Sequence, residues 1–123
     1  MTATDRLAAI EERLANATPG PWDWVPSAVE GGSHVLGVVG ESGFPVLRTS
    51  PYAPPRQRDA EFIAHARTDV PRLVKALEAV LEDHKPRTHA THTGCRECGQ
   101  LWPCNTQRAI EAALTTDTKG DKR

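Results

Sequence analysis

The chain has 123 residues, of which 38% are hydrophobic and 5% aromatic, and its formal net charge at pH 7 is -1. This is the length of one domain, and its low apolar content predicts a thin core that needs a further source of stability, such as a bound metal. No apolar run approaches the roughly 20 residues that a membrane-spanning helix needs. The first residues carry charges within their apolar pattern and lack the small-residue cleavage site of a signal peptide. We therefore expect a cytoplasmic protein without membrane contact.

The first predicted element is a helix over residues 4–16. Its leucines and Ile10 recur at helical spacing on one face. Thr2 or Thr4 can cap the first turn, because a threonine hydroxyl accepts hydrogen bonds from the N–H groups that a helix start leaves without partners. The Pro-Gly-Pro sequence at residues 19–21 ends the helix.

A small antiparallel sheet is predicted to follow. Its strands cover three stretches, residues 22–25, 34–39 and 44–49. The last two stretches are rich in β-branched residues, and residues 40–43 (Gly-Glu-Ser-Gly) are typical of a hairpin turn between them. The two glycines at residues 31–32 supply the preceding turn. Pro26 and Pro45 suit sheet edges or strand ends, because proline cannot donate to a central ladder.

A long helical pattern then runs over residues 57–83, with apolar residues along one face. Pro71 interrupts this pattern, and Thr68 can cap a second segment that places Pro71 in its first turn. We expect either two consecutive helices or one helix with a break near Thr68. Pro86 follows closely and acts as a stop signal.

The C-terminal part begins with residues 85–94, which are polar and which we expect to be irregular. A last helix is predicted over residues 106–114, with Asn105 or Thr106 as its cap. Its inward face is predicted to carry Ala109, Ile110, Ala113 and Leu114. Residues 115–123 lack apolar side chains and are predicted to be a disordered tail.

The three cysteines, Cys95, Cys98 and Cys104, lie within ten residues of one another. A Cys-x2-Cys pair suits zinc, because a tight turn can direct both thiolates at one point roughly 2.3 Å away. Gly99 follows the pair and provides the backbone freedom that such a turn needs. Cys104 precedes the predicted last helix, whose N-terminal N–H groups stabilise a thiolate. The pattern predicts a small, closed, structural zinc site.

Zinc in a structural site takes four ligands, so one position remains after the three cysteines. Three histidines, His84, His89 and His92, are candidates for it. His84 is favoured because it would tether the end of the long helix to the metal loop. His92 is nearest in sequence, but it would require three ligands to converge from one short stretch. Water or a ligand from another chain are further alternatives.

Other chemistries for the cysteines are less well supported. Three buried, free cysteines are the simplest alternative, although such close clustering is unlike scattered core cysteines. A redox Cys-x2-Cys motif would need a thioredoxin-like strand-to-helix context, which is missing here. A catalytic zinc needs an open coordination position and a general base, for which Glu97 is the nearest carboxylate.

Two stretches resemble a known group of proteins. The sequences ATPGPW at residues 17–22 and DAEFIAHARTDVPRLVKAL at residues 59–77 are similar to Ead-like proteins of actinobacteria and their phages. The segment HKP-x8-CRECGQLWPCNT at residues 84–106 resembles a recurrent module of the same group. The resemblance implies a phage or prophage origin and a zinc knuckle, and it independently favours His84 as the fourth ligand. It implies no activity.

Together these patterns predict an α+β fold. Its elements in order are an N-terminal helix, a small antiparallel β-sheet, a long or broken helix, a zinc knuckle and a short helix. We expect one domain over residues 1–83, a knuckle module over residues 84–114 packed on it, and a tail over residues 115–123.

Three functions are compatible with this fold. We expect foremost a small zinc-binding interaction protein that is not an enzyme and that binds a protein partner. Nucleic-acid binding is the first alternative, because residues 84–123 carry a net charge of +3 and the basic knuckle includes Lys85, Arg87, Arg96 and Arg108. A nucleotide-binding protein or small enzyme that uses Trp22 and Trp24 is the second alternative. Exposed sheet edges would also allow a homodimer.

Overall fold

The computed structural model describes residues 2–30, 33–40, 45–49 and 55–116. These residues form helices and antiparallel strands in the predicted order, so the α+β class is confirmed. The chain divides into two compact units, one made of Met1–Glu12 with Val74–Arg123 and the other of Arg13–Leu73. The knuckle therefore belongs to one unit with the start of the first helix. The division at residue 83 stays a prediction.

Helix α1 spans Ala3–Asn16, so it begins one residue before the predicted start and ends where predicted. Thr2 rather than Thr4 caps it: the Asp5 backbone N–H donates to the Thr2 hydroxyl at 3.2 Å, and the Thr2 backbone N–H donates to the Asp5 carboxylate at 2.9 Å. This reciprocal pair is a capping box, which satisfies two N–H groups that the helix start would otherwise leave without partners. The hydrogen bonds from Thr2 to its carboxylate hold the pKa of Asp5 below its usual value.

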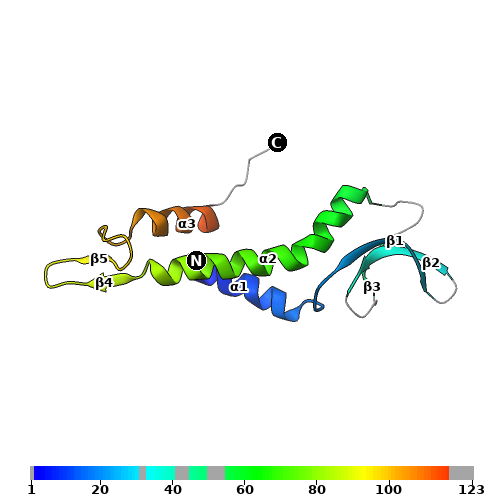
Figure 1. Cartoon of the computed structure of the whole chain (residues 1–123), viewed down its shortest axis with the longest axis horizontal. Helices are drawn as coiled ribbons and strands as arrows, with labels where there is room; N and C mark the ends of the chain where they lie inside the picture. The colour runs from blue at the N-terminus through cyan, green and yellow to red at the C-terminus, as the bar shows by residue number, and fades with distance from the viewer. Residues whose placement is uncertain (1, 31–32, 41–44, 50–54, 117–123) are drawn as a thin grey trace. The chain divides into compact units, whose positions relative to one another are not determined.

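The three-stranded sheet contains β1 (Asp23–Glu30), β2 (Ser33–Val39) and β3 (Pro45–Thr49), with β2 in the centre (Figure 1). Both pairings are antiparallel. Pro26 and Pro45 therefore lie on edge strands, as predicted, and Pro26 falls where the register shifts between Val25 and Ala28. The first strand is longer than the predicted residues 22–25, because this irregularity lets pairing resume beyond the proline.

The turns predicted for this sheet lie mostly outside the described residues. The first predicted turn, residues 31–32, lies outside the described residues, and so do residues 41–43 of the hairpin turn and Phe44 at the start of the third predicted strand. Gly40 is described and buried; a Cβ there would lie 3.2 Å from Cγ2 of Thr18. The close approach of Thr18 gives a physical reason for glycine at this position.

Helix α2 spans Gln57–Asp83 as one continuous element that includes Pro71. The structure has the long helix, and the expected interruption, either a division into two helices or a break near Thr68, was wrong. Proline in a helix interior removes one hydrogen bond and costs about 3 kcal/mol, which usually produces a local bend. The ribbon of α2 bends in its N-terminal half (Figure 1), while its hydrogen-bonded helix continues on both sides of the proline.

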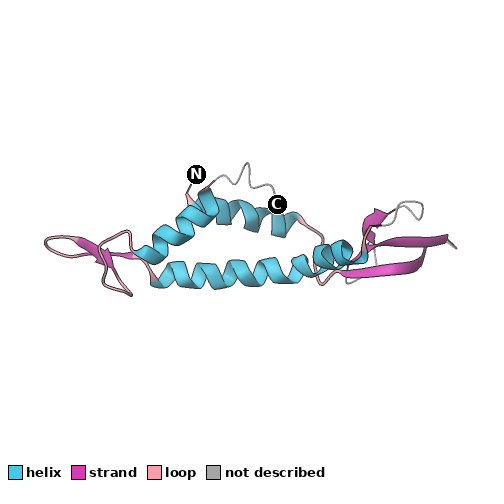
Figure 2. Ribbon diagram, turned by 90° about the horizontal axis from the view of Figure 1, so that it is seen from above, coloured by secondary structure: helices cyan, strands magenta, loops and turns pink. Residues whose placement is uncertain are grey.

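The C-terminal segment contains β4 (Pro86–Thr88), β5 (Thr93–Cys95) and α3 (Asn105–Thr115). The expectation that residues 85–94 are irregular was wrong, because β4 and β5 pair as a short antiparallel hairpin directly after α2 (Figure 2). Its residues are polar and show no apolar alternation, so no hydrophobic pattern reveals these strands. Thr115, predicted to belong to the tail, is helical, and residues 117–123 lie outside the described residues.

The core is thin. Among the described residues, the buried apolar side chains are Ala3, Leu7, Ala60, Ala64, Val74, Cys95 and Cys104. Only Leu7 and Val74 among them are branched aliphatic residues. The predicted inward face of α3 was partly wrong, since Ala109 and Ala113 are exposed and Ile110 and Leu114 are half-buried. Helix α3 is instead tied to the start of α1 by a hydrogen bond of 2.9 Å from the Ala3 N–H to the Glu111 carboxylate.

Candidate metal centre

The residues of the predicted site come from the end of α2, from β5 and the turn after it, and from the start of α3. His84 directly follows α2, and its N–H donates to the Val80 carbonyl at 3.0 Å, which continues the last helical turn. Cys95 is the last residue of β5, and Cys98 follows in the next turn. Cys104 is the N-cap of α3. The ends of regular elements therefore hold three of the four side chains, which restricts their positions.

The turn between Cys95 and Gln100 has the backbone geometry of a knuckle. The Gly99 N–H donates to the Cys95 carbonyl at 3.0 Å, and the Cys95 N–H donates to the Gln100 carbonyl at 2.7 Å. Gly99 has φ +73, a left-handed conformation that L side chains rarely adopt. The prediction that Gly99 shapes this turn is confirmed. The turn brings Cys98 to the same side as Cys95.

The four side chains predicted as ligands meet at one place. One potential ligand atom from each of His84, Cys95, Cys98 and Cys104 lies within 4.8 Å of all the others. Sγ of Cys95 is 3.4 Å from Nδ1 of His84, and Sγ of Cys104 is 3.6 Å from the same nitrogen. Tetrahedral zinc with ordinary bond lengths would place a sulfur and a nitrogen ligand about 3.6 Å apart. The donor set and these separations fit zinc.

The N–H groups of the turn favour a negative charge on Cys95. Burial of this thiol opposes its ionisation, but the backbone N–H groups of Cys98 and Glu97 donate to its sulfur and outweigh that effect. The side chains of Cys98 and His84 act in the same direction, and the pKa of Cys95 falls from 9.0 to about 6. A thiolate is the form that binds metal, so this environment favours metal binding by Cys95.

The other two cysteines differ from Cys95. A backbone hydrogen bond from Gln100 lowers the pKa of Cys98, but burial and the neighbouring thiols Cys95 and Cys104 outweigh it and raise that pKa above its ordinary value. Three thiolates in one place repel each other unless a cation lies between them. The sulfur of Cys104 accepts the Gln107 N–H at 3.4 Å, at the positive end of α3. The predicted caps Asn105 and Thr106 were wrong, because Cys104 occupies that position.

The remaining candidate histidines lie elsewhere. His89 and His92 stack on each other at the end of the β4–β5 hairpin, with ring centroids 4.8 Å apart, and both are exposed. Thr91 lies within hydrogen-bonding distance of His92 at 3.1 Å. In the part of the chain that the structure describes, His84 is thus the histidine that joins the three cysteines. Glu97 is exposed on the turn.

The other predicted site residues make structural contacts. The indole N–H of Trp22 donates to the Thr18 carbonyl at 3.0 Å, and both Trp22 and Trp24 are half-buried. Arg67 donates to the same carbonyl at 2.9 Å, so the Pro-Gly-Pro segment is held against α2 within its own unit.

Two of the basic knuckle residues contact the end of α2. Lys85 pairs with the Glu82 carboxylate at 2.6 Å, and the Arg96 guanidinium donates to the Glu82 carbonyl at 2.9 Å. The Arg96 N–H also donates to the Lys85 carbonyl at 2.9 Å.

Sequence reasoning missed Gln100. Its side-chain oxygen accepts the Asn105 N–H at 2.9 Å, while its backbone carbonyl accepts the Cys95 N–H. Gln100 therefore connects the first cysteine to the start of α3. A glutamine in a polar loop has no distinguishing pattern, so only the folded turn identifies this role.

Replacing Gly99 with alanine is expected to destabilise the knuckle by roughly 1–2 kcal/mol, because an L residue is disfavoured at positive φ. An added Cβ would meet no atom within 4 Å, so steric overlap contributes nothing. Gly99→Asn is the matched control and should cost less, since asparagine tolerates this conformation. Urea unfolding of the zinc-loaded protein measures both changes. An alanine variant as stable as the parent would refute the backbone argument.

Comparison with known proteins provides no relative. A scan against family models and searches of curated proteins and of solved structures found no match to this chain. Of the helices within the described ranges, none has the length and apolar character required to cross a membrane.

Proposed function

We propose that His84, Cys95, Cys98 and Cys104 bind one structural zinc ion. The observation that carries this proposal is the convergence of one nitrogen and three sulfur donors within 4.8 Å. Zinc would stabilise a unit whose buried apolar side chains are few and small, because the binding free energy of a structural metal contributes directly to folding. Four protein ligands complete a tetrahedron and leave no open position for a substrate, which supports a structural and not a catalytic metal.

On this basis, the protein is a small, non-enzymatic interaction protein that is encoded by a phage or prophage and binds a protein partner in the cytoplasm. The resemblance of residues 17–22, 59–77 and 84–106 to Ead-like phage proteins supports the origin. Exposed apolar side chains next to the knuckle support the interaction role: Leu101 is 69% exposed and Val80 is 39% exposed. Apolar side chains in such positions are candidates for contact with another protein.

The metal content of freshly purified protein tests this proposal. Elemental mass spectrometry, combined with the native mass, is expected to find one zinc per chain. Thiol titration in the same sample should find the three cysteines unreactive until a chelator is added, because metal-bound thiolates react poorly. Absence of metal, with three reactive thiols, would refute the zinc site and with it the closed-site argument for a non-enzymatic role.

Nucleic-acid binding is the second candidate, because Lys85, Arg87, Arg96 and Arg108 are all exposed in the unit that contains the knuckle. Binding of a fluorescent oligonucleotide should then weaken steeply with salt, since neutralised phosphates release counterions. The contacts of Lys85 and Arg96 with Glu82 reduce the positive charge available for phosphates. No binding at low salt would exclude this candidate.

A further inference from the structure

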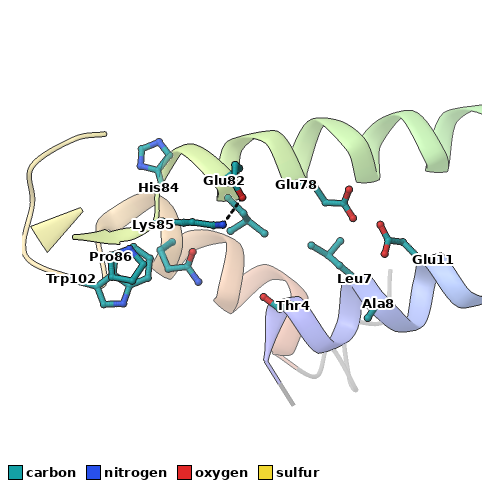
Figure 3. Close-up of a pocket in the computed structure, with 12 residues that line it drawn as sticks. Thr4, Leu7, Ala8, Glu11, Glu78, Glu82, His84, Lys85, Pro86 and Trp102 are labelled. Atoms are coloured by element: carbon teal, nitrogen blue, oxygen red, sulfur yellow. Dashed lines mark ion pairs between the residues drawn. The ribbon is translucent and has the colours of Figure 1, made fainter. Parts of the chain in front are cut away.

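A groove beside the candidate metal centre has a distinctive lining (Figure 3). Its volume is about 560 Å³, and the first turns of α1, the C-terminal part of α2 and the knuckle form its walls. All of its lining residues belong to one compact unit. The apolar part of the lining consists of Leu7, Ala8, Leu81, Pro86 and Trp102. An aromatic ring and aliphatic side chains in a groove of this size can receive a side chain from another molecule.

The polar part of the lining includes three glutamates, Glu11, Glu78 and Glu82. Glu11 on α1 and Glu78 on α2 point toward each other across the groove, as Figure 3 shows. A hydrogen bond between the two carboxyl groups, together with burial and their mutual repulsion, raises the pKa of Glu78. The charge of Lys75 lowers the pKa of Glu78, but its effect is smaller than the effects that raise it. Two carboxylates that face each other are destabilising when both are ionised, and a cation between them would remove that cost.

The third carboxylate of the groove, Glu82, already has a cationic partner. Lys85 pairs with it at 2.6 Å, and both residues line the groove. The positive charge of Lys85 is thus already paired with the negative charge of Glu82. This arrangement leaves the Glu11–Glu78 pair as the position in the groove where additional positive charge would be most favourable.

We propose that this groove docks a basic segment of a protein partner, with an arginine whose guanidinium meets Glu11 and Glu78 and an adjoining part of the segment that lies against Trp102 at the other end of the groove. The proposal rests on the proposed function as a protein-binding module and names the chemistry of its partner. A guanidinium is suited to the Glu11–Glu78 pair because its planar group donates several hydrogen bonds to carboxylates. Nucleic acid is disfavoured as the occupant, because the same carboxylates would repel its negatively charged phosphates.

The groove depends on the knuckle. His84 lines both the candidate metal centre and the groove. Trp102 is held by a hydrogen bond of 2.9 Å from its N–H to the Thr93 carbonyl, and Thr93 lies in the same short strand as Cys95. Zinc binding would therefore hold one wall of the groove in place, and docking of the partner would require the metal-loaded form.

The test uses the zinc-loaded full chain and a capped pentapeptide, Gly-Arg-Gly-Arg-Gly, with Gly-Glu-Gly-Glu-Gly as the matched peptide. The indole N–H signal of Trp102, assigned with Trp102→Phe, is followed by NMR during titration. We expect a saturable shift with the arginine peptide only. Glu78→Gln and Glu11→Gln should each weaken binding at least tenfold, whereas Glu12→Gln, an equal charge change at an exposed neighbouring position, should leave it within twofold.

Thermal unfolding separates a loss of docking from a loss of fold. A carboxyl whose pKa is raised in the folded state destabilises that state at pH values above its ordinary pKa, so Glu78→Gln should unfold at the same or a higher temperature. An unmoved Trp102 signal at millimolar arginine peptide, or equal weakening by Glu12→Gln, would overturn the groove proposal. If either result is obtained with protein that holds one zinc per chain, the zinc proposal still stands. Peptide binding by a chain from which the metal has been removed would overturn the requirement for the metal-loaded form and would not bear on the zinc site.

Discussion

Replacing Cys98 with serine is expected to abolish zinc binding and to unfold residues 84–115, while the sheet of the other unit stays folded. Cys98 is exposed and does not cap a helix, so the substitution removes a proposed metal ligand and little else. The free energy of binding a structural zinc is on the order of 10 kcal/mol and is part of the folding free energy. The few buried apolar side chains of this unit cannot replace that contribution.

Elemental mass spectrometry and amide hydrogen exchange measure this result. His89→Ala is the matched control, because His89 is exposed on the hairpin and outside the cluster. The control should retain one zinc and native protection, whereas His84→Ala should behave like Cys98→Ser. Native protection of residues 84–115 in a metal-free Cys98→Ser variant would contradict the structural role of the metal. Loss of zinc in His89→Ala alone would assign the fourth ligand differently.

Replacing Leu7 with alanine is expected to lower the free energy of unfolding by about 2–5 kcal/mol, the usual cost of truncating a buried leucine. Leu7 is only 5% exposed and, with Val74, supplies the largest buried aliphatic side chains of the described residues. So few large side chains leave little alternative packing that could fill the resulting cavity. Urea unfolding of the zinc-loaded protein measures the change.

Leu73→Ala provides the comparison for Leu7. It removes the same side chain from α2, but Leu73 is 67% exposed, so we expect a change within about 0.5 kcal/mol. A similar loss of stability for both variants would mean that Leu73 is covered by another copy or by a partner. A small loss for Leu7→Ala would show that the packing of α1 in its unit is not a main source of stability.

Helices α1 and α2 and the sheet strands were predictable because their sequences are locally consistent. Helical spacing and caps mark the helices, and β-branched residues mark β2 and β3. The hairpin of β4 and β5 was not predictable, since its residues are polar and its pairing depends on nonlocal hydrogen bonds such as that from the Arg96 N–H to the Lys85 carbonyl. Pro71 wrongly indicated an interruption of α2, because a proline lowers the stability of a helix without necessarily ending it.

The sequence by itself determined the chemistry of the candidate metal centre. Three cysteines at this spacing, with a glycine after the second, indicate a tight turn whose sulfur atoms prefer a soft cation. Only the tertiary structure decided which histidine joins them, because His84 is distant in sequence and reaches the cysteines when the β4–β5 hairpin folds back from the end of α2. The tertiary structure alone also placed Glu11 against Glu78. Their proximity depends on how α1 and α2 pack, and the spacing of residues within one helix does not predict that packing.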